Sequence, residues 1–162
     1  MKNYHQPGMP QTAASFGLEY RDPNFWWVGA NVNYLANSYI DFANILRTDN
    51  FSLDSSGDTY NGATPETVKD ILKQEKFDNF TLVNLTGGKS WRISKANRNT
   101  VGFFASVNNV FDVTYKTGGF EQSRKATFPD LQADQANNTP SFGSKYFYGY
   151  VRTFFVNFYI NF

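Results

Sequence analysis

Five segments of the chain alternate apolar and polar residues with a period of two, which is the pattern of β-strands that have one apolar face. The predicted strands cover residues 12–20, 25–40, 80–93, 101–111 and 145–162. In the second segment, Trp26 and Val28 share one face and Trp27 lies on the other. The facing of the third strand stays open, because its neighbours Leu82 and Val83 are both apolar. The pattern predicts an all-β, antiparallel fold.

The connections between these strands alternate in length. The first and third connections are short and polar, whereas residues 41–78 and 114–143 form two long polar stretches. Tight turns at one end and long loops at the other are typical of outer-membrane β-barrels. The sequence therefore predicts a transmembrane barrel segment with long extracellular loops.

The first long stretch also contains a short helix signal, "TPETVKDILKQEK" at residues 64–76. Thr64 suits the N-cap and Pro65 suits the first helical position. The apolar positions Val68, Ile71 and Leu72 share one face of this helix. One extracellular loop is thus expected to carry a short helix.

Composition supports strands rather than helices as the membrane-crossing elements. Aromatic residues make up 19% of the 162 residues, yet the mean hydropathy is −0.50 and no apolar run has the length of a transmembrane helix. Strands with one polar face reconcile these values. The alternative is a soluble β-sandwich that binds carbohydrate, but the polar faces are rich in Asn and Thr and carry few charges, which favours the barrel.

Candidate chemistry is sparse. The chain has no Cys and one His, His5, so a multi-histidine metal site or a catalytic triad is hard to assemble. The segment "TGGKS" at residues 86–90 ends like a phosphate-binding loop, but Val83 stands where that motif needs Gly. The net charge of +1 and the scattered Lys and Arg residues do not support nucleic-acid binding. We expect no enzyme activity, no metal and no cofactor.

Some side chains on the less apolar faces are candidates for a lumen or ligand-binding surface, since amides and aromatic rings suit sugars and peptides. These residues are Trp27, Asn31, Asn33, Asn108, Asn157 and Tyr159. For any single one of them, lining a hydrated wall or packing against an internal plug is the simpler interpretation. The last strand has the clearest apolar face, which is expected to face lipid. This face comprises Phe154, Val156, Phe158, Ile160 and Phe162.

Three sequence motifs resemble one family. The segment "VNNVFDVTYKTGGFEQSR" at residues 107–124 resembles the penultimate strand and following loop of TonB-dependent outer-membrane receptors. The segments "LVNLTGGKSW" and "KYFYGYVRTFFVNFYINF" are similar to the SusC/RagA-type branch, with one departure at Val151, where Gly is expected. The motif positions are Asn108, Asn109, Phe111, Asp112, Gly118, Gly119 and Phe120.

The resemblance implies a fold, a location and partners. Residues 1–162 would be the C-terminal part of the barrel domain, the last five strands of a roughly 22-stranded barrel. The plug domain and earlier strands would be missing, so the chain would start partway through a longer protein and would not transport alone. Such receptors import glycans or peptides across the outer membrane of Gram-negative bacteria. The implied partners are outer-membrane lipid, the rest of the barrel and its plug, the TonB complex, a SusD-like surface lipoprotein and the barrel-assembly machinery, which would read the terminal aromatic strand.

Overall fold

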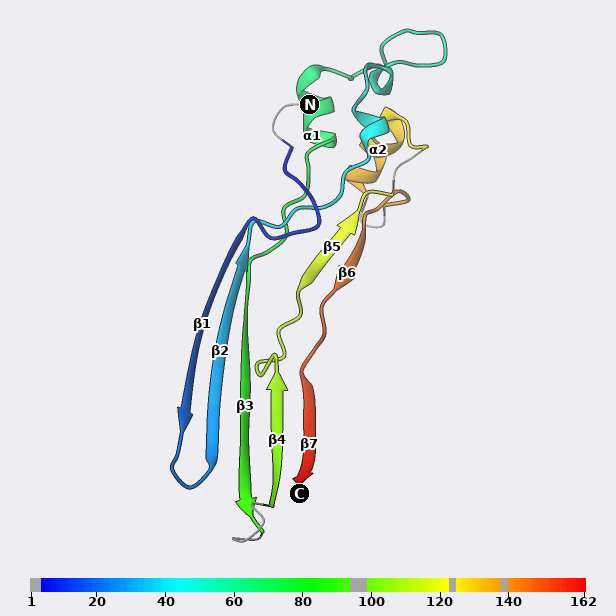
Figure 1. The fold of residues 1–162 in the computed structure, drawn as a ribbon. Helices are drawn as coiled ribbons and strands as arrows, with labels where there is room; N and C mark the ends of the chain where they lie inside the picture. Colours follow the sequence, from blue (N-terminus) through cyan, green and yellow to red (C-terminus); the bar gives the residue numbers. More distant parts are fainter. Residues whose placement is uncertain (1–3, 94–98, 123–124, 138–139) are drawn as a thin grey trace. The chain divides into compact units, whose positions relative to one another are not determined.

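The computed structural model describes residues 4–93, 99–122, 125–137 and 140–162 (Figure 1). The chain divides into two compact units. The loop unit comprises Met1–Pro10, Asn37–Asp78 and Lys116–Tyr148, and the sheet unit comprises Gln11–Ala36, Asn79–Tyr115 and Gly149–Phe162. The two long connections predicted from the sequence thus supply most of the loop unit.

The sheet unit is one antiparallel, five-stranded sheet with the order β1-β2-β3-β4-β7. Its strands are β1 (Thr12–Arg21), β2 (Trp26–Ala36), β3 (Phe80–Arg92), β4 (Thr100–Asn108) and β7 (Thr153–Asn161). The predicted all-β, antiparallel fold is confirmed. The sheet is open, with β1 and β7 at its edges. The segment "TGGKS" lies inside β3, as its interpretation as strand sequence predicted.

Strand register sorts the side chains onto two different faces, because residues directly opposite each other in an antiparallel pair share a face. Val83 lies opposite Val32, and Leu85 lies opposite both Ala30 and Val107. This settles the facing of β3: Val83 and Leu85 join the apolar face, while Leu82 lies on the polar one.

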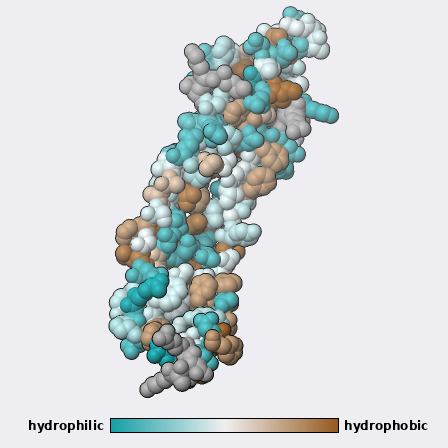
Figure 2. Space-filling view, viewed as in Figure 1, coloured by the Kyte–Doolittle hydropathy of each residue, from teal (hydrophilic) through white to brown (hydrophobic). Residues whose placement is uncertain are grey.

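The apolar face is uncovered within the sheet unit. The exposed fraction reaches 77% for Phe158 on β7 and 67% for Leu18 on β1. Hydrophobic residues also reach the surface in several places on the side of the molecule seen in Figure 2. A sheet in water normally covers such a face with a second layer. Among the described residues of the sheet unit there is no such layer.

Asparagine residues end two of the strands earlier than predicted. Asn37 follows β2 with φ 59°, and Asn109 follows β4 with φ 52°. Both values lie in the left-handed region, which asparagine tolerates better than most residues and which cannot continue a strand. The predicted strands at residues 25–40 and 101–111 were therefore too long.

The predicted fifth strand, residues 145–162, is wrong as a single element. It consists of two strands in different sheets, β6 (Lys145–Tyr148) in the loop unit and β7 in the sheet unit. Residues 149–152 separate them, and the sequence "GYVR" of this break contains Gly149. Strand β6 pairs with β5 (Lys116–Phe120), which lies in a stretch that the sequence predicted to be a loop. Gly118 and Gly119 weaken the strand signal there.

The loop unit has a small core of its own. It contains the 3₁₀ helices η1 (Asn44–Arg47) and η2 (Asp49–Ser52), the helices α1 (Pro65–Ile71) and α2 (Phe128–Ala136), and the β5–β6 hairpin. Leu46, Phe51, Leu72 and Phe128 form its buried cluster. Phe128 is fully buried, and the rings of Phe51 and Tyr60 pack against it. The long connections are thus folded structure.

Side-chain caps explain where the two α-helices begin. The Thr64 hydroxyl accepts from the Thr67 amide at 3.3 Å, and the Thr67 hydroxyl accepts from the Thr64 amide at 2.9 Å, as the predicted N-cap requires. Helix α1 ends at Ile71, earlier than the predicted segment. Helix α2 was not predicted, although Asp130 accepts two hydrogen bonds from Thr127 at its start. No helix in the described parts of the chain is long and apolar enough to span a membrane.

Candidate functional site

The polar face of the sheet unit gathers the residues predicted to line a lumen or bind a ligand. Register places all six on this face: Trp27, Asn31, Asn33, Asn108, Asn157 and Tyr159. Trp27 and Asn157 share one row across the sheet, with Gly88 and Phe104 between them. The structure therefore brings the six candidates to one surface, and their role there stays a prediction.

An amide cluster occupies the β1–β2 side of this face. The Asn33 side-chain amide donates to Asn31 Oδ1 at 2.5 Å, and the Asn31 amide donates to Ser15 Oγ at 3.0 Å. A shallow depression of about 270 Å³ lies beside it, lined by residues that include Gly17, Gly29 and Asn31. Asn31, Asn84 and Thr86 are among the residues that line the depression, and such amides and hydroxyls can pair with the hydroxyls or peptide groups of a ligand.

Aromatic rings from β2, β4 and β7 share the same face, and two of them lie against glycines of the neighbouring strand. A Cβ atom added to Gly88 would lie 2.8 Å from Trp27 Nε1, so only glycine leaves room for the indole. The ring centroids of Trp27 and Phe104 are 6.4 Å apart, and the two ring planes are inclined by 17°. Tyr159 lies over Gly102 in the same way, and its hydroxyl is 2.5 Å from Ser90 Oγ. The rings form a flat platform that could stack on a ligand or pack against another part of a protein.

The motif at the end of β4 forms a dense cluster of hydrogen bonds with the backbone. The buried Asn109 side chain donates to the carbonyls of Val113 and Tyr150, and its Oδ1 accepts from the Val113 amide. Asp112 accepts from the Arg152 amide at 2.8 Å, and the Asn109 amide donates to Asn84 Oδ1 at 2.9 Å. These contacts join the end of β4 to the segment before β7 and to β3. The motif therefore has a structural role in this chain.

Replacing Asn109 by Ala should lower the free energy of unfolding of the sheet unit by about 2 kcal/mol, because it removes three part-buried hydrogen bonds of the Asn109 side chain and places Ala at positive φ. The matched control is Asn108→Ala, which removes one exposed contact with Thr153. Denaturant unfolding of both variants in the same medium measures the difference. Equal stability of the two variants would contradict the role assigned to Asn109.

Of the other motif residues, Phe111 follows β4 and is exposed, whereas Gly118, Gly119 and Phe120 belong to β5 in the loop unit. A Cβ on Gly119 would crowd the carbonyl of Lys145 and the ring of Tyr146, so this position needs glycine for the close approach of β6. The ring of Phe120 is 40% exposed and packs beside Phe147. As with Asn109, the structure gives these β5 residues a role in backbone packing.

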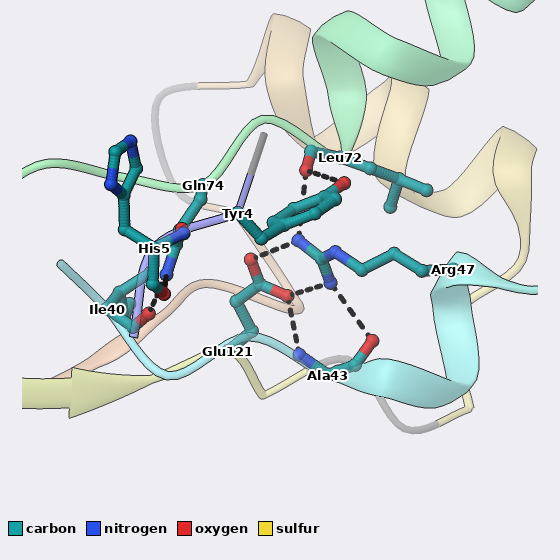
Figure 3. A network of polar contacts seen from close by, with 8 residues as sticks. All are labelled: Tyr4, His5, Ile40, Ala43, Arg47, Leu72, Gln74 and Glu121. Atoms are coloured by element: carbon teal, nitrogen blue, oxygen red, sulfur yellow. Dashed lines mark hydrogen bonds and ion pairs between the residues drawn. The ribbon is translucent and has the colours of Figure 1, made fainter. Parts of the chain in front are cut away.

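A buried ion pair that the sequence did not predict holds the loop unit together. Both terminal nitrogens of Arg47 donate to Glu121, at 2.6 and 2.7 Å, and only 3% of the Arg47 side chain is exposed (Figure 3). The same nitrogens donate to the carbonyls of Ala43 and Leu72. The guanidinium lies 5.0 Å from the ring centroid of Tyr4. One side chain thus connects η1, the end of α1, the end of β5 and the N-terminal segment.

A second clamp holds the N-terminal segment on the loop unit. The Gln74 side chain accepts from the His5 amide at 2.8 Å and donates to the carbonyls of His5 and Ile40 (Figure 3). The His5 ring stacks on Tyr39 with centroids 4.0 Å apart. The only histidine is therefore engaged in packing. Neither Arg47 nor Gln74 carried a sequence signal, because their partners lie far away along the chain.

Electrostatics in the loop unit favour the charged forms of its paired cations. Burial alone would lower the pKa of Arg47, but the hydrogen bond and charge of Glu121 outweigh it and raise that pKa. Lys116, 2.8 Å from Glu75, shows the same balance, and its pKa is also raised. Burial, followed by the hydrogen bond to Glu75, raises the pKa of the Tyr146 hydroxyl. Each of these groups is paired with a carboxylate of the loop unit, which suits a structural role.

The loop unit also contains an open groove of about 850 Å³ between the segment that leads into η1 and the end of β5. Its walls include Phe42, Ile45 and Phe120, with Asp41 and Gln122 at polar positions. No group of three or more metal-ligating side chains occurs among the residues that the structure describes. The groove offers shape and apolar contact to a ligand.

The chain matches no protein-family model, no curated protein and no solved structure.

Proposed function

We propose that the sheet unit is part of the wall of an outer-membrane transporter that imports glycans or peptides, and that the transporter is a TonB-dependent receptor of the SusC/RagA type. The observation that carries the proposal is the continuous apolar face, which runs over all five strands and has no covering layer in the described sheet unit. The opposite face carries amides, hydroxyls and flat rings. One lipid-facing side and one hydrated side are what a barrel wall requires.

The connections support the same assignment. Because adjacent strands are antiparallel, the short connections after β1 and β3 leave one end of the sheet, and the long connections after β2 and β4 leave the other. In the first short connection, Asp22 accepts from the Asn24 amide and Phe25 adopts φ 62°. We assign the short turns to the periplasmic side and the ends where the long connections leave the sheet to the extracellular side.

Transport needs more than this sheet. An open sheet exposes unpaired strand edges in lipid, so β1 and β7 would pair with further strands of a closed barrel. A plug, the TonB complex, a SusD-like surface lipoprotein and the barrel-assembly machinery are the partners that this function implies. The amide cluster and ring platform of the polar face would then border the lumen.

The alternative, a soluble carbohydrate-binding β-sandwich, has less support. A sandwich buries its apolar faces between two sheets about 10 Å apart. The described residues of the sheet unit supply only one sheet, and its apolar face is exposed.

Fractionation and growth test the proposal together. The tagged polypeptide, expressed as encoded, is expected in the outer-membrane fraction of the producing bacterium, and deletion of its gene is expected to abolish growth on at least one glycan or peptide source. Density-gradient separation with outer-membrane and soluble marker proteins measures the first result, and growth on a nutrient panel measures the second. Recovery in the soluble fraction would reject the membrane assignment, whereas unchanged growth on every nutrient would reject import.

A further inference from the structure

A single lysine interrupts the apolar face of the sheet unit. Lys89 of β3 lies opposite Trp26 of β2 and Phe103 of β4, so register places it on the face that is otherwise apolar or uncharged. It is the only charged residue on this face among the residues that the structure describes. A charged side chain on a lipid-facing surface is costly unless its charge is compensated.

No carboxylate of the described chain compensates this charge. Among the described residues, the three ion pairs join Arg21 to Glu19, Arg47 to Glu121 and Lys116 to Glu75. The contact that the structure shows for Lys89 Nζ is with the ring of Trp91, whose centroid is 5.5 Å away. This ring attracts the ammonium group but leaves its net charge and its N–H donors available.

Lys89 lies close to the end of the sheet that carries the short turns. It is opposite Trp26, the first residue of β2, and three positions before Arg92, the last residue of β3. Trp26 and Trp91 are 38% and 46% exposed on the same face. Tryptophan rings at the end of a lipid-facing surface lie at headgroup level, and a lysine stem can carry its ammonium group to the same level.

We propose that Lys89, flanked by Trp26 and Trp91, binds the headgroup phosphate of an anionic phospholipid in the membrane leaflet on the side of the short turns. This inference rests on the membrane assignment proposed above. The phosphate supplies the missing negative charge, and its oxygens accept hydrogen bonds from the ammonium group. The two indoles add N–H donors and apolar contact with the upper acyl chains.

The test uses the intrinsic fluorescence of the two flanking tryptophans. The third tryptophan of these 162 residues, Trp27, lies on the polar face; it and any tryptophan encoded outside these residues are replaced by Phe to give the parent protein. The polypeptide as encoded is reconstituted into phosphatidylcholine vesicles that contain a minor fraction of brominated phosphatidylglycerol or brominated phosphatidylcholine. Bromine quenches only nearby indoles, so the ratio of the two quenching curves reports which lipid occupies the surface beside Trp26 and Trp91.

We expect the parent protein to prefer phosphatidylglycerol over phosphatidylcholine about five-fold. This is the effect of one basic residue near the surface of a membrane. Lys89→Gln should reduce the preference to about one-fold, and high salt should weaken it in the parent. The control Lys69→Gln makes the same charge change on α1 in the loop unit and should keep the preference.

The outcomes separate the two proposals. Quenching by both lipids with an unchanged preference in Lys89→Gln would overturn the phosphate site and leave the membrane assignment in place. A loss of stability in Lys89→Gln without any lipid preference in the parent would also overturn it, because it would point to a protein carboxylate as the partner of Lys89. No quenching by either lipid would show that the apolar face does not contact lipid, and both proposals would fail.

Discussion

Replacing Arg47 by Met should destabilise the loop unit by about 3 kcal/mol, because Glu121 would keep a largely buried charge without its partner. The change would also remove the hydrogen bonds to the carbonyls of Ala43 and Leu72 and the contact with the Tyr4 ring. Because these contacts join four separate segments, their loss should affect the whole loop unit. Amide hydrogen exchange of residues in its buried cluster, such as Leu46 and Leu72, measures the effect.

Two further variants show whether the cost comes from the buried charge. Arg21→Met removes the same side chain from an exposed pair with Glu19 and should leave exchange in the loop unit unchanged. The double variant Arg47→Met with Glu121→Leu removes both charges and should recover part of the lost stability. If Arg47→Met exchanged at the rate of the unchanged protein, the pair would not hold the loop unit together.

The alternation of apolar and polar residues predicted the sheet unit well. Strands β1, β2, β3 and β4 begin within one residue of the predicted positions, because each has a period-two pattern and a polar boundary. The ends of β2 and β4 were missed, since Asn37 and Asn109 look like ordinary polar strand residues until their positive φ is known. The division between β6 and β7 was missed because the aromatic alternation continues through Tyr150 across the break.

The loop unit could not be predicted to the same extent, for a different physical reason. Its stability comes from contacts between residues that are far apart in sequence and have no periodic pattern. Arg47 and Glu121 are separated by 74 positions, and Gln74 reaches His5 across 69. The N-caps of α1 and α2 are local signals, and only the cap of α1 was predicted. Polar composition alone therefore made a folded unit look like two loops.

The segment that resembles the receptor motif has a local structural role in this chain. The resemblance at Asn108–Asp112 suggested a receptor, whereas the structure explains what Asn109 and Asp112 do locally: they tie the end of β4 to the segment before β7. A hydrogen-bond cluster at this position is compatible with a barrel wall, since it fixes where a long connection leaves the sheet. Evidence for the membrane must come from the apolar face itself.

Placing Arg at Val156 should sharply reduce the amount of protein assembled in the outer membrane. Val156 belongs to the row that contains Val28 and Ala105 on the apolar face, and it is 55% exposed. In lipid, an arginine on this face costs about 2–4 kcal/mol at the middle of the bilayer and less toward the headgroups. Val156 lies one row inward from Lys89, so we expect a cost between these limits. In water, the same substitution at an exposed valine would cost little. The size of the loss in assembled protein therefore shows whether lipid or water surrounds the face.

The adjacent residue supplies the control. Asn157 lies on the polar face, in the row of Phe104 and Trp27, so Asn157→Arg adds the same side chain one position away but directs it to the hydrated side. Immunoblots of outer-membrane fractions, normalised to a resident membrane protein, should show near-normal levels for Asn157→Arg and strong loss for Val156→Arg. Equal levels of the two variants would mean that the apolar face does not lie in lipid, and the barrel-wall assignment would have to be abandoned.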